Sequence, residues 1–248
     1  AFDRCSWEYM LEGLRLLGFG QGFINYVRLF YNEDNPPTRQ IASNGRLGRR
    51  FPLGSGVAQG CPISPALFLV ITEALSRMIQ DDKDIHGIQV GDTHHKLSQY
   101  ADDSTLIARD DDDVTRLTGH LSVWCHATGM RENDTKREGL LLGKLARERH
   151  RAPTGIIKDD AWAADGKAIR VLGAPMGNKL DLTAWWWEKY RSVKARTAMW
   201  LSTAHLSITG RNMLIQSILY GSLRYFAFCI VVPAPIITAL QRDAYNLM

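Results

Sequence analysis

The stretch "LSQYADDSTLIARD", residues 97–110, places two adjacent aspartates between two segments that favour β-structure. Polar and apolar residues alternate before the pair, and Thr105, Leu106 and Ile107 after it are typical of a strand. The stretch therefore predicts a β-hairpin with Asp102 and Asp103 at or beside its turn. Asp is common in turns, so a structural role is one explanation. However, this turn has no glycine, and its two like charges repel each other unless a cation neutralises them.

Composition limits the class of protein. The chain has 248 residues, of which 45% are apolar and 23% charged. A chain of this length and composition can bury one large core or two smaller ones. No basic-then-apolar leader opens the sequence. The longest apolar stretch, residues 225–240, is shorter than a membrane span of about 20 residues and predicts a buried helix pair divided at Pro233. The four cysteines are far apart, which argues against a zinc site and predicts an intracellular protein of the nucleus or cytoplasm.

The net charge of +4 is unevenly distributed. Residues 176–248 hold eight Lys or Arg against three Asp or Glu, a net charge of +5, so residues 1–175 carry −1. A basic C-terminal segment is typical of a surface that grips a polyanion. An ordinary solvated helix face has the same pattern, and charge alone does not separate the two.

Periodicity and turn residues predict the order of elements. Strands and helices mix up to residue 175 and the rest is helical, which indicates an α+β fold with an all-α appendage. In the predicted second helix Phe23, Ile24, Val27 and Phe30 share the inward face, and Ser64 is the predicted N-cap of the third. At least one of Trp185–Trp187 must face a core. Hairpins are predicted at Asn44-Gly45 and Gly91-Asp92, and helices near 7–17, 23–30, 64–79, 114–124, 180–203, 209–230 and 234–248.

A second unusual segment is "GVAQGCPISPALF", residues 56–68, in which glycines flank Val57 to Gln59 and two prolines lead into an apolar helix. Glycine allows a backbone to approach a ligand closely, and the amide of Gln59 can face a base or sugar edge. Each glycine by itself also fits an ordinary turn. The occurrence of this segment together with an aromatic-Ala-Asp-Asp hairpin downstream is much less expected by chance than a single turn glycine.

Four further segments accompany these motifs: "AFDRCSWEYM", "TGMRENDTKREGLLLG", "IRVLGAPMG" and "LSITGRNMLIQSIL". In their order and spacing the sequence resembles the reverse transcriptases of non-LTR (LINE-type) retrotransposons, over essentially its whole length. The sequence "QGCPISP", residues 59–65, favours this family over group II intron and retron enzymes. The alanine before Asp102 distinguishes it from the usual retroviral methionine.

The resemblance implies a right-hand polymerase. Residues 1–175 would form the palm, an antiparallel sheet with packed helices, and residues 176–248 an all-α thumb. The implied activity is RNA-directed DNA synthesis, which adds dNTPs to a primer held on an RNA or DNA template. The implied cofactor is Mg²⁺ or Mn²⁺, with Asp102 as the essential ligand and Asp103 as a helper. Partners would be an RNA template, a DNA primer and dNTPs, with no membrane.

The resemblance also implies roles for other residues. Phe2 matches the aromatic residue under the incoming sugar, and Gln59 and Gly60 match the nucleotide-binding turn. Lys136 matches a lysine near the leaving pyrophosphate, although a surface lysine beside Arg137 explains it equally well. Contacts to the primer and template are expected from Leu172, Gly173, Lys189, Lys194, Arg196 and Arg211.

One part of the family pattern is not matched. The other metal-binding aspartate of the family would lie upstream of Ala1, and Asp3 matches an aspartate that is not the metal ligand. The fingers would also precede residue 1. On this interpretation the sequence is an N-terminally truncated fragment without fingers, and we expect the 248-residue chain by itself to be inactive.

Two alternatives stay open. A relic of a decayed retroelement would bind nucleic acid through the same palm and thumb without catalysis, and the intact aspartate pair does not exclude it. A group II intron-type maturase reverse transcriptase would carry a splicing-associated domain after residue 248.

Overall fold

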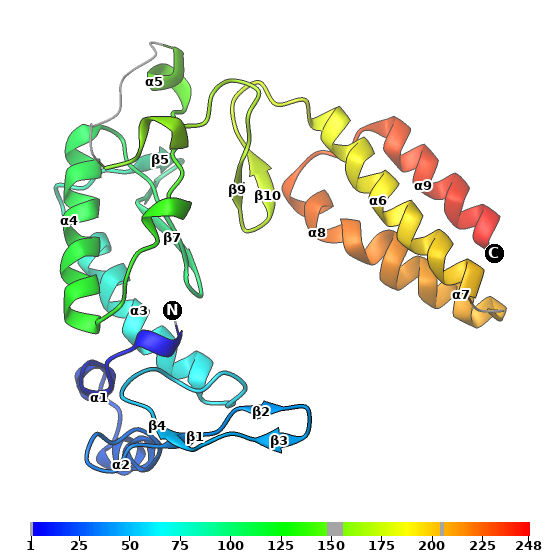
Figure 1. Cartoon of the computed structure of the whole chain (residues 1–248). Coiled ribbons are helices and arrows are strands. Elements are labelled where there is room, and N and C mark those ends of the chain that lie inside the picture. Colours follow the sequence, from blue (N-terminus) through cyan, green and yellow to red (C-terminus); the bar gives the residue numbers. More distant parts are fainter. Residues whose placement is uncertain (1, 148–155, 204–205) are drawn as a thin grey trace. The chain divides into compact units, whose positions relative to one another are not determined.

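The computed structural model describes residues 2–147, 156–203 and 206–248 (Figure 1). The chain divides into two compact units, each with its own apolar core. Unit 1 comprises residues 1–137 and 151–159, and unit 2 comprises residues 138–150 and 160–248. The units divide earlier in the chain than the palm–thumb boundary predicted at residue 175, which stays a prediction.

Four helices build the core of unit 1. Apolar residues at helical spacing make α3 (Ser64–Asp81) its centre, and both α1 (Trp7–Leu16) and α4 (Asp111–Thr128) pack against it. Ile71 and Leu75 of α3 are fully buried, and the Trp124 indole N–H of α4 donates to the Ile71 carbonyl at 2.9 Å. The Ser6 hydroxyl caps α1 by accepting from the Tyr9 N–H. The helices are α1 (Trp7–Leu16), α2 (Gln21–Phe30), α3 (Ser64–Asp81) and α4 (Asp111–Thr128).

Two details of these helices differ from the prediction. Ser64 is the first helical residue of α3 and not its N-cap, which is Ile63; the buried Ser64 hydroxyl lies 3.3 Å from that of Tyr31. The predicted inward face of α2 is also narrower than expected. Only Ile24 and Val27 are buried, because α2 packs mainly on α1, and Phe23 and Phe30 stay exposed.

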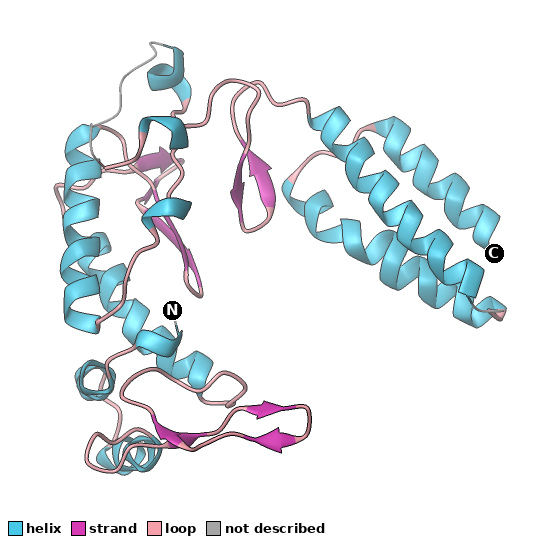
Figure 2. Cartoon of the chain, in the orientation of Figure 1, coloured by secondary structure: helices cyan, strands magenta, loops and turns pink. Residues whose placement is uncertain are grey.

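The strands are short, and each pairs with its hairpin neighbour (Figure 2). The resemblance implied one palm sheet, but in the described ranges the strands form five separate two-stranded antiparallel sheets. Strands of two to four residues bury too little surface to recruit further neighbours. The pairs are β1 (Thr38–Arg39) with β4 (Phe51–Pro52), β2 (Ala42–Ser43) with β3 (Arg46–Leu47), β5 (Ile88–Val90) with β6 (Thr93–His95), β7 (Leu97–Tyr100) with β8 (Asp103–Leu106), and β9 (Ile169–Val171) with β10 (Ala174–Met176).

The segment before α3 lies directly against the first residues of the chain. The Gly56 N–H donates to the Cys5 carbonyl and the Val57 N–H to the Phe2 carbonyl, both at 2.8 Å. Gly56 has φ of 86°, and a Cβ there would lie 2.7 Å from backbone atoms of Asp3. Only glycine fits such a close approach in the left-handed region. The glycine therefore fixes this turn to the N-terminal segment.

Unit 2 is a helical bundle preceded by the β9–β10 hairpin (Figure 2). Trp186 is fully buried and donates its indole N–H to the Val231 carbonyl at 3.0 Å, as expected for one of the three adjacent tryptophans. Pro233 is the N-cap of α9, which confirms the predicted break. The elements are α6 (Leu182–Thr203), α7 (Ile208–Leu214), a π-helical segment (Ile215–Tyr220), α8 (Gly221–Cys229) and α9 (Ala234–Leu247).

Short helical elements complete the described chain: η1 (Phe2–Arg4), η2 (Asp134–Lys136), α5 (Gly143–Arg147) and η3 (Asp159–Ala161). In the described residues, none of the helices has the length and apolar character that crossing a membrane requires. The cysteines Cys5, Cys61, Cys125 and Cys229 all lie in described segments, and none of them forms a disulfide.

Candidate functional site

The aspartate pair lies at the tip of the β7–β8 hairpin. Tyr100 pairs with Asp103, so the turn consists of Ala101 and Asp102, and Asp103 is the first residue of β8. At the other end of the hairpin Leu97 and Leu106 face each other and pack against the core of unit 1. Both carboxylates are exposed. The structure thus confirms a hairpin with the two aspartates at and beside its turn.

The neighbouring β5–β6 hairpin has the same turn length, with Gly91 and Asp92 between the paired Val90 and Thr93. Gly91 has φ of 61°, which glycine adopts readily. Ala101 holds the equivalent position with φ of 52°, a left-handed conformation that destabilises a non-glycine residue by about 1 kcal/mol. Such strain gathers at functional sites, so it supports a role for this turn beyond chain reversal.

The two carboxylates start from different places on the hairpin. Side chains alternate between the faces of a strand. Leu106 packs on the core, so Asp103, three residues earlier, lies on the opposite face together with its cross-strand partner Tyr100. Asp102 stands in the turn itself. The two carboxylates therefore start from adjacent positions at one end of the hairpin.

Asp102 and Asp103 have the oxygen ligands that a divalent cation prefers, but two side chains are too few to form a complete metal site. Carboxylate oxygens are the hard ligands that Mg²⁺ takes in octahedral geometry. Among the described residues, neither Asp102 nor Asp103 accepts a hydrogen bond or pairs with a cation, so both carboxylates are accessible. No group of three His, Cys, Asp or Glu side chains gathers in the described part of the chain. Asp102 and Asp103 thus fit part of a metal centre.

The candidate nucleotide-binding residues also lie in unit 1. The ring of Phe2 stacks on Phe68 of α3 with centroids 4.5 Å apart, and its carbonyl accepts from Val57. Gln59 and Gly60 follow in an exposed turn, with φ of 88° at Gly60. The structure therefore joins Phe2 to the segment that leads to Gln59. Phe2, Leu97 and Leu106 pack against the same core, but the contacts of the described residues do not link Phe2 or Gln59 to the two carboxylates.

Lys136 ends the turn η2, which Asn133 caps by accepting from the Thr135 N–H at 3.2 Å. Its neighbour Arg137 pairs with Glu132 and Asp134 and donates to the Ile156 carbonyl. Lys136 itself is exposed. Of the two adjacent cations, Arg137 is therefore held by its own unit, and Lys136 is accessible to a ligand.

The candidate primer contacts are in unit 2. Leu172 and Gly173 form the turn between β9 and β10, with φ of 49° and 84°. The Tyr225 hydroxyl of α8 donates to the Leu172 carbonyl at 2.7 Å and fixes this turn to the helices. The Nζ atom of Lys189 lies 5.4 Å from the centre of the Trp185 ring, a cation–π contact.

The three other cations differ in what they bind. Lys194 pairs with Asp243 of α9 at 3.0 Å, and this carboxylate, with the Tyr190 hydroxyl, raises the pKa of the lysine. Arg211 donates to the Leu206 and Leu247 carbonyls, both at 3.4 Å. Arg196 is exposed. Two of the predicted nucleic-acid contacts, Lys194 and Arg211, therefore also hold the bundle together.

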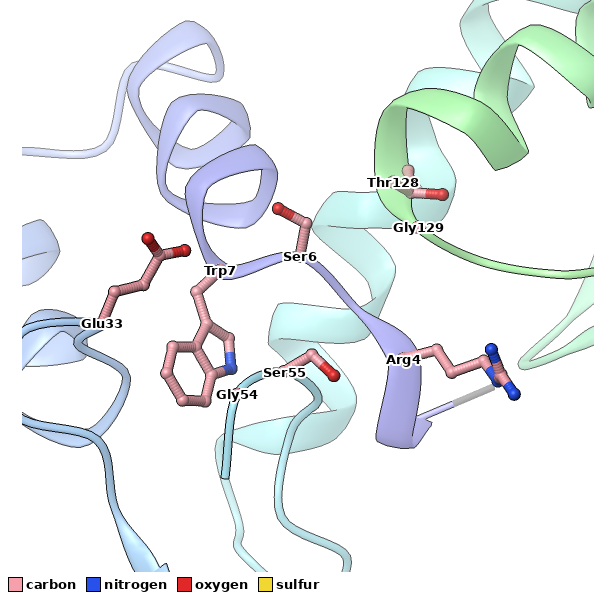
Figure 3. A pocket seen from close by; sticks show the side chains of 8 residues that line it. All are labelled: Arg4, Ser6, Trp7, Glu33, Gly54, Ser55, Thr128 and Gly129. Atoms are coloured by element: carbon pink, nitrogen blue, oxygen red, sulfur yellow. The ribbon is translucent and has the colours of Figure 1, made fainter. Parts of the chain in front are cut away.

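A separate open pocket of about 280 Å³ occurs in unit 1 (Figure 3). Arg4, Ser6 and Glu33 are among the side chains around it, and neither Asp102 nor Asp103 lines it. The pocket is lined by one basic residue, Arg4, and one acidic residue, Glu33, and it is not part of the site formed by the two aspartates.

Comparison with known proteins identifies the class. Residues 1–176 match the family described as reverse transcriptase (RNA-dependent DNA polymerase). The chain belongs to this family. Its relatives include Pol polyproteins of R2 retrotransposable elements and a protein of transposon TX1, which confirms the resemblance to non-LTR retrotransposon reverse transcriptases.

Three relatives illustrate the relation. An uncharacterized 149 kDa protein of transposon TX1 from Xenopus laevis is 28% identical over 250 residues, all of this chain and 18% of that protein. The Pol polyprotein of the type-2 retrotransposable element R2DM from Drosophila melanogaster is 31% identical over 108 residues, 44% of this chain and 10% of that protein. The Pol polyprotein of element R2 from Popillia japonica is 30% identical over 114 residues, 46% of this chain and 15% of that protein. The chain thus spans less than a fifth of each relative's length.

Two charged features of unit 1 did not emerge from the sequence analysis. Asp113 lies among the acidic residues of the first turn of α4, yet it is fully buried. The hairpin of residues 38–52 was predicted only as a hairpin, yet it carries four arginines. A signal for the second was present, since residues 35–72 contain no Asp or Glu.

Proposed function

We propose that this chain is part of an RNA-directed DNA polymerase in which Asp102 is the essential metal ligand and Asp103 assists it. The observation that carries this proposal is the pair of exposed carboxylates at a strained two-residue turn, within the residues that match the reverse transcriptase family. Divalent cations bound there would polarise the attacking and leaving oxygens of nucleotidyl transfer. The residues of the chain itself would hold, orient and protonate the reactants.

In this mechanism Phe2 lies under the sugar of the incoming dNTP, held by its stack on Phe68 and by Val57. Gln59 and Gly60 present an amide and an exposed backbone to the nucleotide. Lys136 is placed near the leaving pyrophosphate, where an ammonium can neutralise or protonate a phosphate oxygen.

The template and primer would be bound mainly through unit 2. The Leu172-Gly173 turn, fixed by Tyr225, would steady the primer end. Cations of α6 would contact the sugar–phosphate backbone, which an A-form duplex presents without regard to base sequence. The partners in this proposal are an RNA template, a DNA primer and dNTPs.

RNA-templated primer extension tests the proposal. The assay uses the 248-residue chain and, in parallel, a protein lengthened by the coding sequence that adjoins it in frame. The described residues supply two carboxylates, which are only part of a metal site. We therefore expect activity in the lengthened protein, dependent on Mg²⁺ or Mn²⁺ and abolished by EDTA. Nucleic-acid binding without extension by either protein would contradict the proposal and favour a non-catalytic relic.

A further expectation concerns the salt dependence of duplex binding. Replacing Lys189 and Arg196 by Gln should lower the slope of log affinity against log salt by up to about 0.9 per lost phosphate contact. The matched control replaces Lys167 and Arg224, two exposed cations of unit 2 outside α6, and should change the slope less. The measurement is fluorescence anisotropy over a salt series. Equal slopes for both variants would mean that the cations of α6 do not bind the duplex.

Lys194→Gln is measured separately, because this change is expected to affect the stability of unit 2 as well as duplex binding. Because Lys194 pairs with Asp243, we expect this change to lower the thermal stability of unit 2. Lys194 is for that reason not included in the double variant.

A further inference from the structure

Residues 38–52 form a hairpin, here called the arginine hairpin, that carries Arg39, Arg46, Arg49 and Arg50. Its charge of +4 equals the formal net charge of the whole chain, so all other residues together are neutral. The hairpin itself holds four arginines and no Asp or Glu. The polymerase assignment above does not use it.

The backbone of the arginine hairpin is well defined. Thr38 and Arg39 pair with Pro52 and Phe51 at its base, and Ala42 and Ser43 pair with Leu47 and Arg46 near its tip. Between these pairs two residues of one strand, Gln40 and Ile41, oppose the three residues 48–50 of the other. The extra residue makes a β-bulge at the Arg49-Arg50 step, and bulges bend and twist a ribbon.

The hairpin projects from the helices of unit 1 (Figure 1). Every residue from 41 to 50 is exposed. Asn44 and Gly45 close the tip with φ of 50° and 76°, the left-handed values that a tight hairpin turn requires. The tip is thus held by its own turn and ladder, and not by packing on the core.

The charge of the hairpin is not neutralised within the described chain. None of the four guanidinium groups pairs with a carboxylate there, whereas Arg15, Arg77, Arg109 and Arg116 of the same unit do. Clustered cations without counter-charges repel one another, and a polyanion removes that repulsion. The arrangement therefore fits an anionic partner.

We propose that the arginine hairpin binds the sugar–phosphate backbone of nucleic acid, as a contact site additional to the basic helices of unit 2. Arginine forks match phosphate oxygens in a bidentate way, which lysine does not. The choice of nucleic acid over an anionic membrane rests on the proposed polymerase function, but binding by the hairpin does not require the carboxylates to be active.

The test measures binding of fluorescent single-stranded RNA and of an RNA–DNA duplex to the 248-residue chain. The variant replaces Arg46, Arg49 and Arg50 by Gln. The control replaces Lys83, Arg131 and Lys158, three exposed cations of unit 1, by Gln and so removes the same charge. We expect the hairpin variant to lose affinity about tenfold at low salt and its salt slope to fall by about 2 for the substrate that the hairpin contacts. The control should stay within about threefold of the parent.

Further arms make the result decisive. Replacing the same three arginines by Lys should keep most of the salt slope while weakening binding, because charge remains and the forks are lost. Equal losses in the hairpin and control variants, or no loss in either, would overturn the proposal. So would loss of binding to anionic vesicles with nucleic-acid affinity unchanged, which would indicate a membrane contact.

The experiment also separates this inference from the polymerase proposal. Hairpin-dependent binding together with absent primer extension by the lengthened protein would support the hairpin site and contradict the polymerase. Primer extension with hairpin-independent binding would do the reverse.

Discussion

Asp102→Asn is expected to lower the rate of RNA-templated primer extension by about a thousandfold, while affinity for the primer–template stays within about twofold of the parent. Each tenfold loss corresponds to about 1.4 kcal/mol of barrier, and a missing carboxylate ligand removes stabilisation of both the attacking and the leaving oxygen. The measurement is single-turnover extension by the lengthened protein. Binding is followed separately by anisotropy.

The fold offers a matched control for this substitution. Asp92 is the second residue of a two-residue hairpin turn, as Asp102 is, and it lies in the same unit. Asp92→Asn should therefore leave extension unchanged. Asp103→Asn should have an intermediate effect, because its side chain starts on the face of β8 that Tyr100 shares.

Stability provides a second signature at the same turn. Asp102 accepts no hydrogen bond within the described chain, so Asp102→Asn removes one of two crowded charges and should leave thermal stability equal or slightly raised without metal. If extension by the Asp102→Asn protein stays within a few-fold of the parent, Asp102 is not the metal ligand.

Local patterns predicted the elements that local physics determines. The alternation around Asp102, the Asn44-Gly45 turn and the break at Pro233 all lie in the expected places, because turn residues and side-chain period act over a few positions. Phe23 and Phe30 were misplaced because burial depends on what packs against α2, which no local pattern contains.

The same limit applies to the candidate site. The motifs identified Asp102 and Gln59 by residue type and spacing, but not how the chain surrounds them. Lys194 was predicted as a nucleic-acid contact because it is basic and helical. Its partner Asp243 is 49 residues away in the sequence, so the ion pair could not be inferred from the neighbourhood of either residue.

Asp113 shows how far the role of one acid can differ from that of its neighbours. Acids at a helix N-terminus stabilise the dipole, and Asp110 does cap α4 by accepting from the Asp113 N–H at 3.0 Å. The Asp113 carboxylate, however, accepts from the backbone N–H groups of His86, Gly87 and Arg109 at 2.8–2.9 Å. It thereby joins α4 to the entry of the β5–β6 hairpin and to the segment after β8.

These hydrogen bonds determine the protonation of Asp113. Burial by itself would raise the pKa of this carboxyl, but the three donated N–H bonds outweigh burial, and its pKa is lowered. The pKa in the folded state is thus below that in the unfolded state. The resulting stabilisation is fully present above the unfolded value of about 4 and is lost as the pH falls through the folded value.

Asp113→Asn is therefore expected to lower the free energy of unfolding of unit 1 by about 3 kcal/mol near pH 7, because the amide leaves buried N–H donors without a charged acceptor. The control is Asp112→Asn, an exposed neighbour in the same helical turn. The difference between the parent and Asp113→Asn should shrink as the pH is lowered below about 4, since the parent loses its charge there as well. Urea unfolding across this pH range measures the free energy, and hydrogen exchange should show loss of protection at the amides of His86, Gly87 and Arg109. Equal unfolding free energies for the two variants would mean that the buried carboxylate does not hold these segments together.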